Sequence, residues 1–290
     1  MKKSRKLATL GICSALFLGL AACQKQHATS EGTNQRQSSS AKVPWKASYT
    51  NLNNQVSTEE VKSLLSAHLD PNSVDAFFNL VNDYNTIVGS TGLSGDFTSF
   101  THTEYDVEKI SHLWNQKKGD FVGTNCRINS YCLLKNSVTI PKLEKNDQLL
   151  FLDNDAIDKG KVFDSQDKEE FDILFSRVPT EATTDVKVHA EKMETFFSQF
   201  QFNEKARMLS VVLHDNLDGE YLFVGHVGVL VPADDGFLFV EKLTFEEPYQ
   251  AIKFASKEDC YKYLGTKYAD YTGEGLAKPF IMDNDKWVKL

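Results

Sequence analysis

Residues 221–231 read YLFVGHVGVLV, residues 237–244 read FLFVEKLT, and the residues between them, 232–236, read PADDG. β-Branched and aromatic residues dominate the two outer stretches, whereas Pro, Asp and Gly in the middle are turn formers. The pattern predicts two antiparallel strands joined by a short turn. Another strand is predicted just upstream, at 208–213, so this part of the chain is expected to form an antiparallel meander.

The chain before this meander has the periodicity of helices. Apolar residues recur at spacings of three and four, which places them on one buried face of each helix. The first helix is expected to begin at the capping-box pattern Ser57-Thr58-Glu59-Glu60. Further helices are predicted at 72–88, 104–118, 125–135, 167–175, 186–200 and 256–267, with single strands at 148–152 and 280–282. Helices followed by antiparallel strands predict the α+β class, in one domain over residues 47–290.

Residues 1–22 have the composition of an export signal. Four basic side chains and no acidic ones lie in the first six residues, and Leu7 to Ala22 is almost wholly apolar or small. That run is short for a permanent membrane helix and fits the apolar core of a signal peptide. It ends Leu20-Ala21-Ala22-Cys23, which resembles the bacterial lipobox, where the cysteine is acylated and the bond before it is cut. We expect Cys23 to anchor the chain on the outer face of the cell membrane.

Residues 23–46 are polar and rich in Ser, Gln, Thr and Asn, so they are expected to form a disordered tether. Without the signal, 28 basic side chains remain against 40 acidic ones, a net charge near −12. An acidic chain is a poor ligand for nucleic acid, which we exclude as a partner. Neither a phosphate-binding glycine loop nor a metal-ligand spacing of His and Cys is present, so no cofactor and no metal are expected. Asp153-Asn154-Asp155 lacks the rest of a calcium loop and is interpreted as a turn.

Besides the lipid site Cys23, three cysteines remain in the exported part: Cys126, Cys132 and Cys260. At most one disulfide can form among them, which leaves at least one thiol over. Cys126 and Cys132 are six residues apart, so in one helix they point about 120° away from each other. Cys132 with Cys260 is the better pair, and it leaves Cys126 free.

Cys126 is expected in the first turn of a helix. Gly123 and Thr124 break the chain before it, and Thr124 or Asn125 can serve as the N-cap. At this position the helix dipole favours a thiolate, and the backbone N–H of Cys126 points to where an oxyanion develops. The alternative is a buried structural thiol, since cysteine is often buried and inert.

His226 lies in an apolar strand between Gly225 and Gly228, where another backbone or a substrate can approach closely. A satisfied core histidine is the alternative. If Pro232 pairs with Phe237, Glu241 falls on the same sheet face as His226. If the turn opens by one residue because Pro232 has no N–H, Lys242 takes that place instead.

A thiol at a helix start, an imidazole on a strand and a polar residue on the next strand resemble the papain-like cysteine hydrolases, closest to the bacterial cell-wall peptidases and amidases. The resemblance covers roughly residues 120–243 and implies a nucleophile at Cys126, a base at His226 and an orienting group at Glu241. The chain departs from that group at Asn125 and Arg127, which flank the cysteine. Three residues are candidates for the side chain that completes the oxyanion hole: Trp114, Gln116 and Thr124.

The whole chain also looks like an uncharacterised lipoprotein family of Gram-positive bacteria, through Asn125-Cys126-Arg127, Glu241-Lys242 and Glu247-Pro248-Tyr249-Gln250. The expected function is a membrane-anchored extracellular thiol hydrolase or amidase that acts on cell-envelope peptides. The alternative is a non-catalytic surface lipoprotein on the same scaffold, which binds a peptidoglycan peptide or a surface protein.

Overall fold

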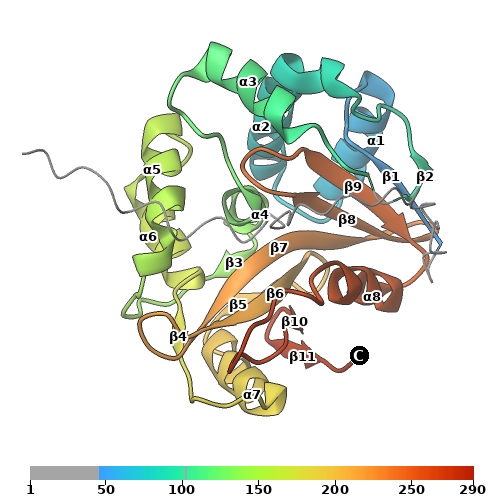
Figure 1. Cartoon of the computed structure of the whole chain (residues 1–290). Helices are drawn as coiled ribbons and strands as arrows, with labels where there is room; N and C mark the ends of the chain where they lie inside the picture. The colour runs from blue at the N-terminus through green and yellow to red at the C-terminus, as the bar shows by residue number, and fades with distance from the viewer. Residues whose placement is uncertain (1–45, 102) are drawn as a thin grey trace, which may run out of the picture. The chain divides into compact units, whose positions relative to one another are not determined.

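The computed structural model describes residues 46–101 and 103–290 (Figure 1). The predicted signal sequence, Cys23 and all of the predicted tether but Lys46 lie outside these residues. Within them, a nine-stranded, largely antiparallel sheet forms the centre, in the order β11-β10-β6-β7-β8-β9-β1-β2, with β4 paired to β7. Its strands are β1 (Ala47–Thr50), β2 (Thr98–Ser99), β4 (Val178–Pro179), β6 (Arg207–Asp215), β7 (Tyr221–Ala233), β8 (Gly236–Lys242), β9 (Tyr249–Phe254), β10 (Phe280–Asp283) and β11 (Lys286–Val288). A separate pair joins β3 (Val138–Thr139) to β5 (Gln201–Phe202).

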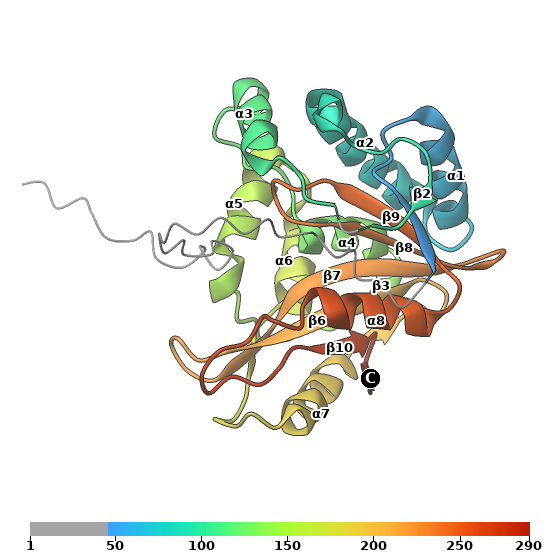
Figure 2. The same cartoon turned by 45° about the vertical axis from the view of Figure 1, so that its right-hand side comes forward.

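The helices lie on both faces of this sheet, with α8 on the opposite side of the strands from α1 and α2 (Figures 1 and 2). They are α1 (Gln55–Ser66), α2 (Pro71–Val88), α3 (Val107–Lys118), α4 (Cys126–Leu134), α5 (Phe151–Gly160), α6 (Ser165–Leu174), α7 (Val186–Phe197) and α8 (Lys257–Lys267), with short 3-10 turns at Gly89–Thr91 and Gln148–Leu150. Side chains of β7 alternate between two cores. Val227 and Val229 pack with α2 and α4, whereas Leu230 packs with α8.

The α+β class is therefore correct, and six of the seven predicted helices begin and end within about three residues of the observed bounds. The helix start at Ser57 is wrong. The α1 helix begins at Gln55, and the side chain of Asn54 caps it by accepting the backbone N–H of Ser57. Asn54 is as good a cap as serine, so the capping-box pattern alone did not decide between them.

The strand predicted at 148–152 is also wrong, because this segment is a 3-10 turn that runs into α5. A short apolar run cannot distinguish a strand from a buried helix. For the same reason Asp153-Asn154-Asp155 is not a turn but part of α5. Two buried strands, β1 and β9, were not predicted, and β1 is held in the sheet by its pairing with β9.

The predicted Cys132–Cys260 disulfide is wrong. Both thiols are free and buried. Cys132 lies on α4 in one core, and Cys260 lies on α8 in the other, so the sheet separates them. Sequence spacing does not reveal on which side of a sheet a helix packs, and that side decides the pairing.

The hairpin between β7 and β8 takes the first of the two predicted registers. Pro232 pairs with Phe237, and Ala233 pairs with Gly236 around a two-residue turn. Beyond Leu230, where β6 begins, β7 no longer has a strand on its other side. One edge of β7 is therefore open at Pro232, where a missing N–H costs least.

A substitution of Gly228 tests how closely β7 and β8 approach each other. A Cβ at this position would lie 2.3 Å from the Phe239 ring and 2.8 Å from the carbonyl oxygen of Val240. We expect Gly228→Ala to lower the free energy of unfolding by about 1–3 kcal/mol through overpacking. Urea unfolding followed by circular dichroism measures the change.

Gly273→Ala is the matched control, because its Cβ would meet only the flexible end of Leu276 at 3.4 Å. That substitution should leave the unfolding midpoint nearly unchanged. Equal midpoints for the two variants would contradict the close approach at Gly228.

Candidate functional site

The site is built on the first turn of α4. Asn125 is the N-cap, and its side chain accepts the backbone N–H of Ile128 at 3.1 Å. Cys126 is the first helical residue, so its own N–H has no carbonyl one turn earlier to donate to. The thiol and an unpaired backbone N–H are thus presented at the same end of the helix.

Cys126, His226 and Glu241 are brought together from three elements. The Cys126 thiol lies close enough to the His226 imidazole for each group to shift the pKa of the other. Nε2 of His226 lies 2.6 Å from Oε2 of Glu241. Because the carboxylate takes Nε2, Nδ1 is the ring nitrogen left for the sulfur. The chain therefore contains a continuous relay of thiol, imidazole and carboxylate.

The contact occurs where β7 and β8 stop pairing. Their pairing ends at Val229 and Val240, just before the strands reach His226 and Glu241. The α4 helix packs on β7 and β8 from one face, and His226 and Glu241 face α8 on the other. Cys126 lies beside the His226 imidazole where the pairing of β7 and β8 ends.

Helix α8 completes the surroundings of the imidazole and the carboxylate. The ring of Tyr268 stacks on His226 with a centroid distance of 4.9 Å and an interplanar angle of 24°. Tyr263 donates its hydroxyl to Oε1 of Glu241, and Nζ of Lys267 lies 3.5 Å from the same oxygen. Both carboxylate oxygens are therefore satisfied, and the rotamer of the imidazole is fixed.

The site is almost closed to solvent. Cys126 is 5% exposed, and His226 and Glu241 are each 2% exposed. Burial alone raises the pKa of a thiol and lowers that of an imidazole. Here the opposite happens for both groups, because each is held beside a partner of opposite charge.

The pKa of Cys126 is lowered: burial raises it, but the charge and hydrogen bond of His226, together with Arg127, outweigh the burial. The pKa of His226 is raised: burial lowers it, but Cys126 and Glu241 outweigh that effect. Burial likewise opposes ionisation of Glu241, yet Lys267, His226 and Tyr263 bring its pKa down to about 2. These directions favour a thiolate–imidazolium pair beside a carboxylate.

The other two thiols behave as buried cysteines ordinarily do. Burial raises the pKa of Cys132 to about 12 and raises that of Cys260 well above its usual value. Among the residues that the structure describes, neither has an imidazole partner. Cys132 and Cys260 therefore serve as references, in the same chain, for the lowered pKa of Cys126.

Lys242, the alternative to Glu241, faces the other side of the sheet. Its ammonium donates to the carbonyls of Thr244, Phe245 and Glu247 and lies 4.2 Å from the centre of the Tyr84 ring. Burial lowers its pKa to about 7. Lys242 therefore organises the loop after β8 and does not take part in the relay.

Asp153 of α5 was not predicted as a site residue. Its carboxylate binds Arg127 through two hydrogen bonds, at 2.9 and 2.7 Å, and accepts a third from Asn125 at 2.7 Å. Arg127 also donates to the carbonyl of Val224 on β7. The residues on both sides of Cys126 are thus fixed by one buried carboxylate, which accounts for the departures at Asn125 and Arg127. In the sequence, the one indication of this residue was the polar triplet Asp153-Asn154-Asp155 beside a short apolar run.

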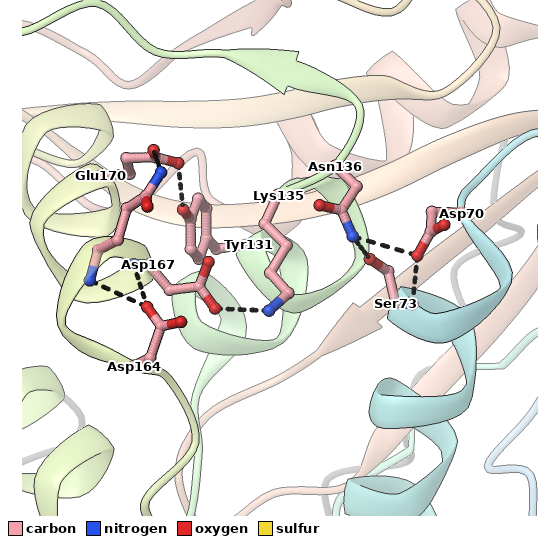
Figure 3. A network of polar contacts seen from close by, with 9 residues as sticks. Asp70, Ser73, Tyr131, Lys135, Asn136, Asp164, Asp167 and Glu170 are labelled. Atoms are coloured by element: carbon pink, nitrogen blue, oxygen red, sulfur yellow. Dashed lines mark hydrogen bonds and ion pairs between the residues drawn. The ribbon is translucent and has the colours of Figure 1, made fainter.

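The far end of α4 is tied to its neighbours by a second polar network (Figure 3). Tyr131 donates to Glu170 of α6, and Lys135 pairs with Asp167. Asn136, just beyond the helix, donates to Asp70 and Ser73 at the start of α2. The position of α4 is consequently fixed at both ends.

The three candidate oxyanion donors are engaged elsewhere or directed away. The indole N–H of Trp114 donates to the carbonyl of Phe121 at 2.6 Å. Gln116 is exposed on α3 and lies beside His112. Thr124 accepts the side-chain amide of Asn129 and lies 3.4 Å from the Tyr249 hydroxyl. The backbone N–H of Cys126 is the donor that the geometry leaves available.

A family model described as "Domain of unknown function (DUF4300)" matches residues 48–288. The chain belongs to the DUF4300 family. Neither the curated proteins nor the solved structures contain a match to it.

Two more findings concern the part of the chain that the structure describes. None of the helices in that part of the chain has the length and apolarity needed to span a membrane. Within the same residues, no group of three or more His, Cys, Asp or Glu side chains is arranged to hold a metal ion.

Asp153→Ala would leave the guanidinium of Arg127 buried without its partner. We expect the free energy of unfolding to fall by about 3–5 kcal/mol, as for other broken buried ion pairs. Chemical denaturation of the purified variant measures it. Asp155→Ala is the control on the same helix, because Asp155 forms only a surface pair with Lys159 and should matter by less than about 1 kcal/mol. A small effect at Asp153 would show that this carboxylate does not fix the start of α4.

Proposed function

We propose that this member of the family is a membrane-anchored extracellular thiol hydrolase that cleaves amide bonds of cell-envelope peptides. The observation that carries the proposal is the contact between Cys126, at the start of α4, and His226, whose other nitrogen binds the buried carboxylate of Glu241. A nucleophile, a base and a group that orients the base are the elements of nucleophilic acyl transfer. The pKa directions of the two reacting groups agree with that role.

In the first step, the Cys126 thiolate attacks the carbonyl carbon of the scissile amide, and the C=O π electrons move onto oxygen. The oxyanion is stabilised by the backbone N–H of Cys126 and by the positive end of α4. The His226 imidazolium then gives its Nδ1 proton to the amide nitrogen. The C–N bond breaks, the amine leaves, and an acyl thioester remains on Cys126.

In the second step, neutral His226 takes a proton from a water molecule at Nδ1, and the resulting hydroxide attacks the thioester carbonyl. The C–S bond breaks, releasing a carboxylic acid and restoring the thiolate–imidazolium pair. Glu241 keeps the second imidazole proton on Nε2 throughout and stabilises the cation. Tyr263 and Lys267 hold the carboxylate in place.

The order of the elements supports a papain-like architecture as part of this proposal. A helix that begins with the cysteine packs across an antiparallel sheet, and the histidine and the carboxylate lie on neighbouring strands. The lipid anchor at Cys23 and the tether through residue 46 would hold this domain close to the envelope, within reach of peptidoglycan peptides.

A second candidate, a non-catalytic lipoprotein that binds a wall peptide or surface protein on the same scaffold, is favoured by one observation. The thiol and the imidazole are both more than nine-tenths buried, as in a satisfied core. Thiol reactivity separates the two candidates, because only the hydrolase requires Cys126 to be an accessible thiolate.

Alkylation by iodoacetamide across a pH series, with the label located by mass spectrometry, measures the fraction of thiolate at each cysteine. Cys126 is expected to react with a midpoint below the usual thiol pKa of about 8.5. His226→Ala removes the cation that lowers the pKa and leaves only burial, so the midpoint should move to higher pH. Glu241→Gln should move it in the same direction by less, because the imidazolium loses its carboxylate.

Cys132 and Cys260 serve as controls within the same molecule and should stay unlabelled in the folded protein across this range. A Cys126 midpoint that is indifferent to His226→Ala would contradict the hydrolase and leave the binding protein. Circular dichroism of each variant shows that the fold is retained.

The anchor is tested separately in cells. A palmitate analogue supplied to the growth medium should label the wild-type chain and not the Cys23→Ala variant, which should appear in the medium or remain unprocessed. Cys13→Ala is the matched control, since Cys13 lies inside the predicted signal and should not affect labelling. Label retained by Cys23→Ala would show that the chain is not acylated at this position.

A further inference from the structure

A cavity of about 160 Å³ lies between α2, α3, the segment that leads to α4 and the loop between β8 and β9. Its walls include Tyr84 of α2, Trp114 of α3, Val122 of the segment that leads to Cys126, and Phe245 and Glu246 of the loop between β8 and β9. This volume suits one long side chain and is well below the roughly 300 Å³ of a typical small-molecule site. The cavity is therefore large enough for one side chain of a longer ligand.

The cavity and the thiol are joined by a short piece of chain. Val122 lies in the cavity wall, four residues before Cys126, and four extended residues span at most about 14 Å. Gly123 has a φ of +90°, and a Cβ built on it would lie 3.3 Å from the Trp114 ring. The bend at Gly123 thus keeps the chain against Trp114 and within a few residues' reach of the thiol.

The walls are held firmly. The rings of Tyr84 and Trp114 have centroids 5.8 Å apart, and the Tyr84 hydroxyl donates to the carbonyl of Glu246 at 2.5 Å. From inside the fold, the buried ammonium of Lys242 binds three carbonyls of the same loop. The aromatic faces and the loop form a pre-organised pocket, which lowers the cost of binding.

The charge of the pocket is negative. Glu246 is the charged side chain among its lining residues, and Ser111 and Asn115 add neutral polar groups. Lys118, at the end of α3, has its ammonium 5.6 Å from the centre of the Trp114 ring and is paired with Asp83 at 2.7 Å. The ammonium of Lys242 donates its hydrogen bonds to the loop carbonyls. Aromatic faces beside a carboxylate are complementary to a cation carried on an aliphatic chain.

We propose that this cavity is the specificity subsite of the Cys126 centre and takes a cationic side chain of the peptide substrate, such as lysine or another ω-amino residue. The proposal rests on the proposed function, since the subsite is defined by its place beside the nucleophile. The aliphatic part of the side chain packs on Tyr84, Trp114 and Val122. The terminal ammonium approaches the Glu246 carboxylate.

Peptidyl acyloxymethyl ketones that alkylate a thiolate test this proposal directly. Three tripeptide probes carry lysine, norleucine or glutamate at one position and alanine at the others, with that position placed first or second before the reactive ketone. The rate of Cys126 labelling is followed by intact mass. At one of the two positions, lysine should react about 3- to 10-fold faster than norleucine, its neutral counterpart, and glutamate slowest.

For each variant we compare the labelling rate of the lysine probe with that of the norleucine probe. A general change in the reactivity of the Cys126 thiol alters both rates alike and cancels in their ratio. Glu246→Gln should bring the ratio to about one, and Glu246→Lys should bring it below one. Glu258→Gln, an exposed carboxylate at the start of α8 on the other face of the sheet, should keep the wild-type ratio.

Equal rates for lysine and norleucine at both positions, with Cys126 still labelled in a His226-dependent way, overturn the subsite and leave the hydrolase standing. A lysine preference that survives Glu246→Gln also overturns it. The absence of His226-dependent labelling by every probe and by iodoacetamide overturns both proposals.

Discussion

A carboxylate with no exposed surface must be compensated from every side, and Glu241 is such a group. Its two oxygens are met by His226 from β7 and by Tyr263 and Lys267 from α8. Removing a carboxylate from water costs several kcal/mol unless its partners are well placed. The end of β8, the part of β7 that carries His226 and the C-terminal half of α8 are therefore constrained to meet at one point, and this meeting sets the orientation of the imidazole.

A second buried carboxylate performs the matching task on the other side of the sheet. Asp153 holds Arg127 and Asn125, the two neighbours of Cys126, and Arg127 continues to the backbone of β7. Buried ion pairs contribute little net stability compared with a well-packed apolar core, but they specify geometry. The two anchors together bring the start of a helix in one core close to a strand side chain that faces the other core.

The pKa values of the three thiols differ because their surroundings differ. All three are buried, and in Cys132 and Cys260 burial leaves the pKa above the usual value of a thiol. The pKa of Cys126 falls because an imidazolium and a guanidinium lie beside it. A pocket lined by Tyr84, Trp114 and Glu246 also contains Val122, which lies four residues before Cys126 in the chain.

The sequence by itself determined the features that depend on neighbours along the chain. Every helix but α5, the β7–β8 hairpin, the placement of Cys126 at a helix start and the position of His226 in a glycine-bordered strand follow from periodicity and turn chemistry over a few residues. Only the tertiary structure decided the pairing at Pro232, which depends on β6 beginning at Arg207, and with it the choice of Glu241 over Lys242. It also separated Cys132 from Cys260 and placed Asp153, Tyr263 and Tyr268 around the site, because which face of a sheet a helix covers is set by the packing of residues far apart in the chain and leaves no local pattern.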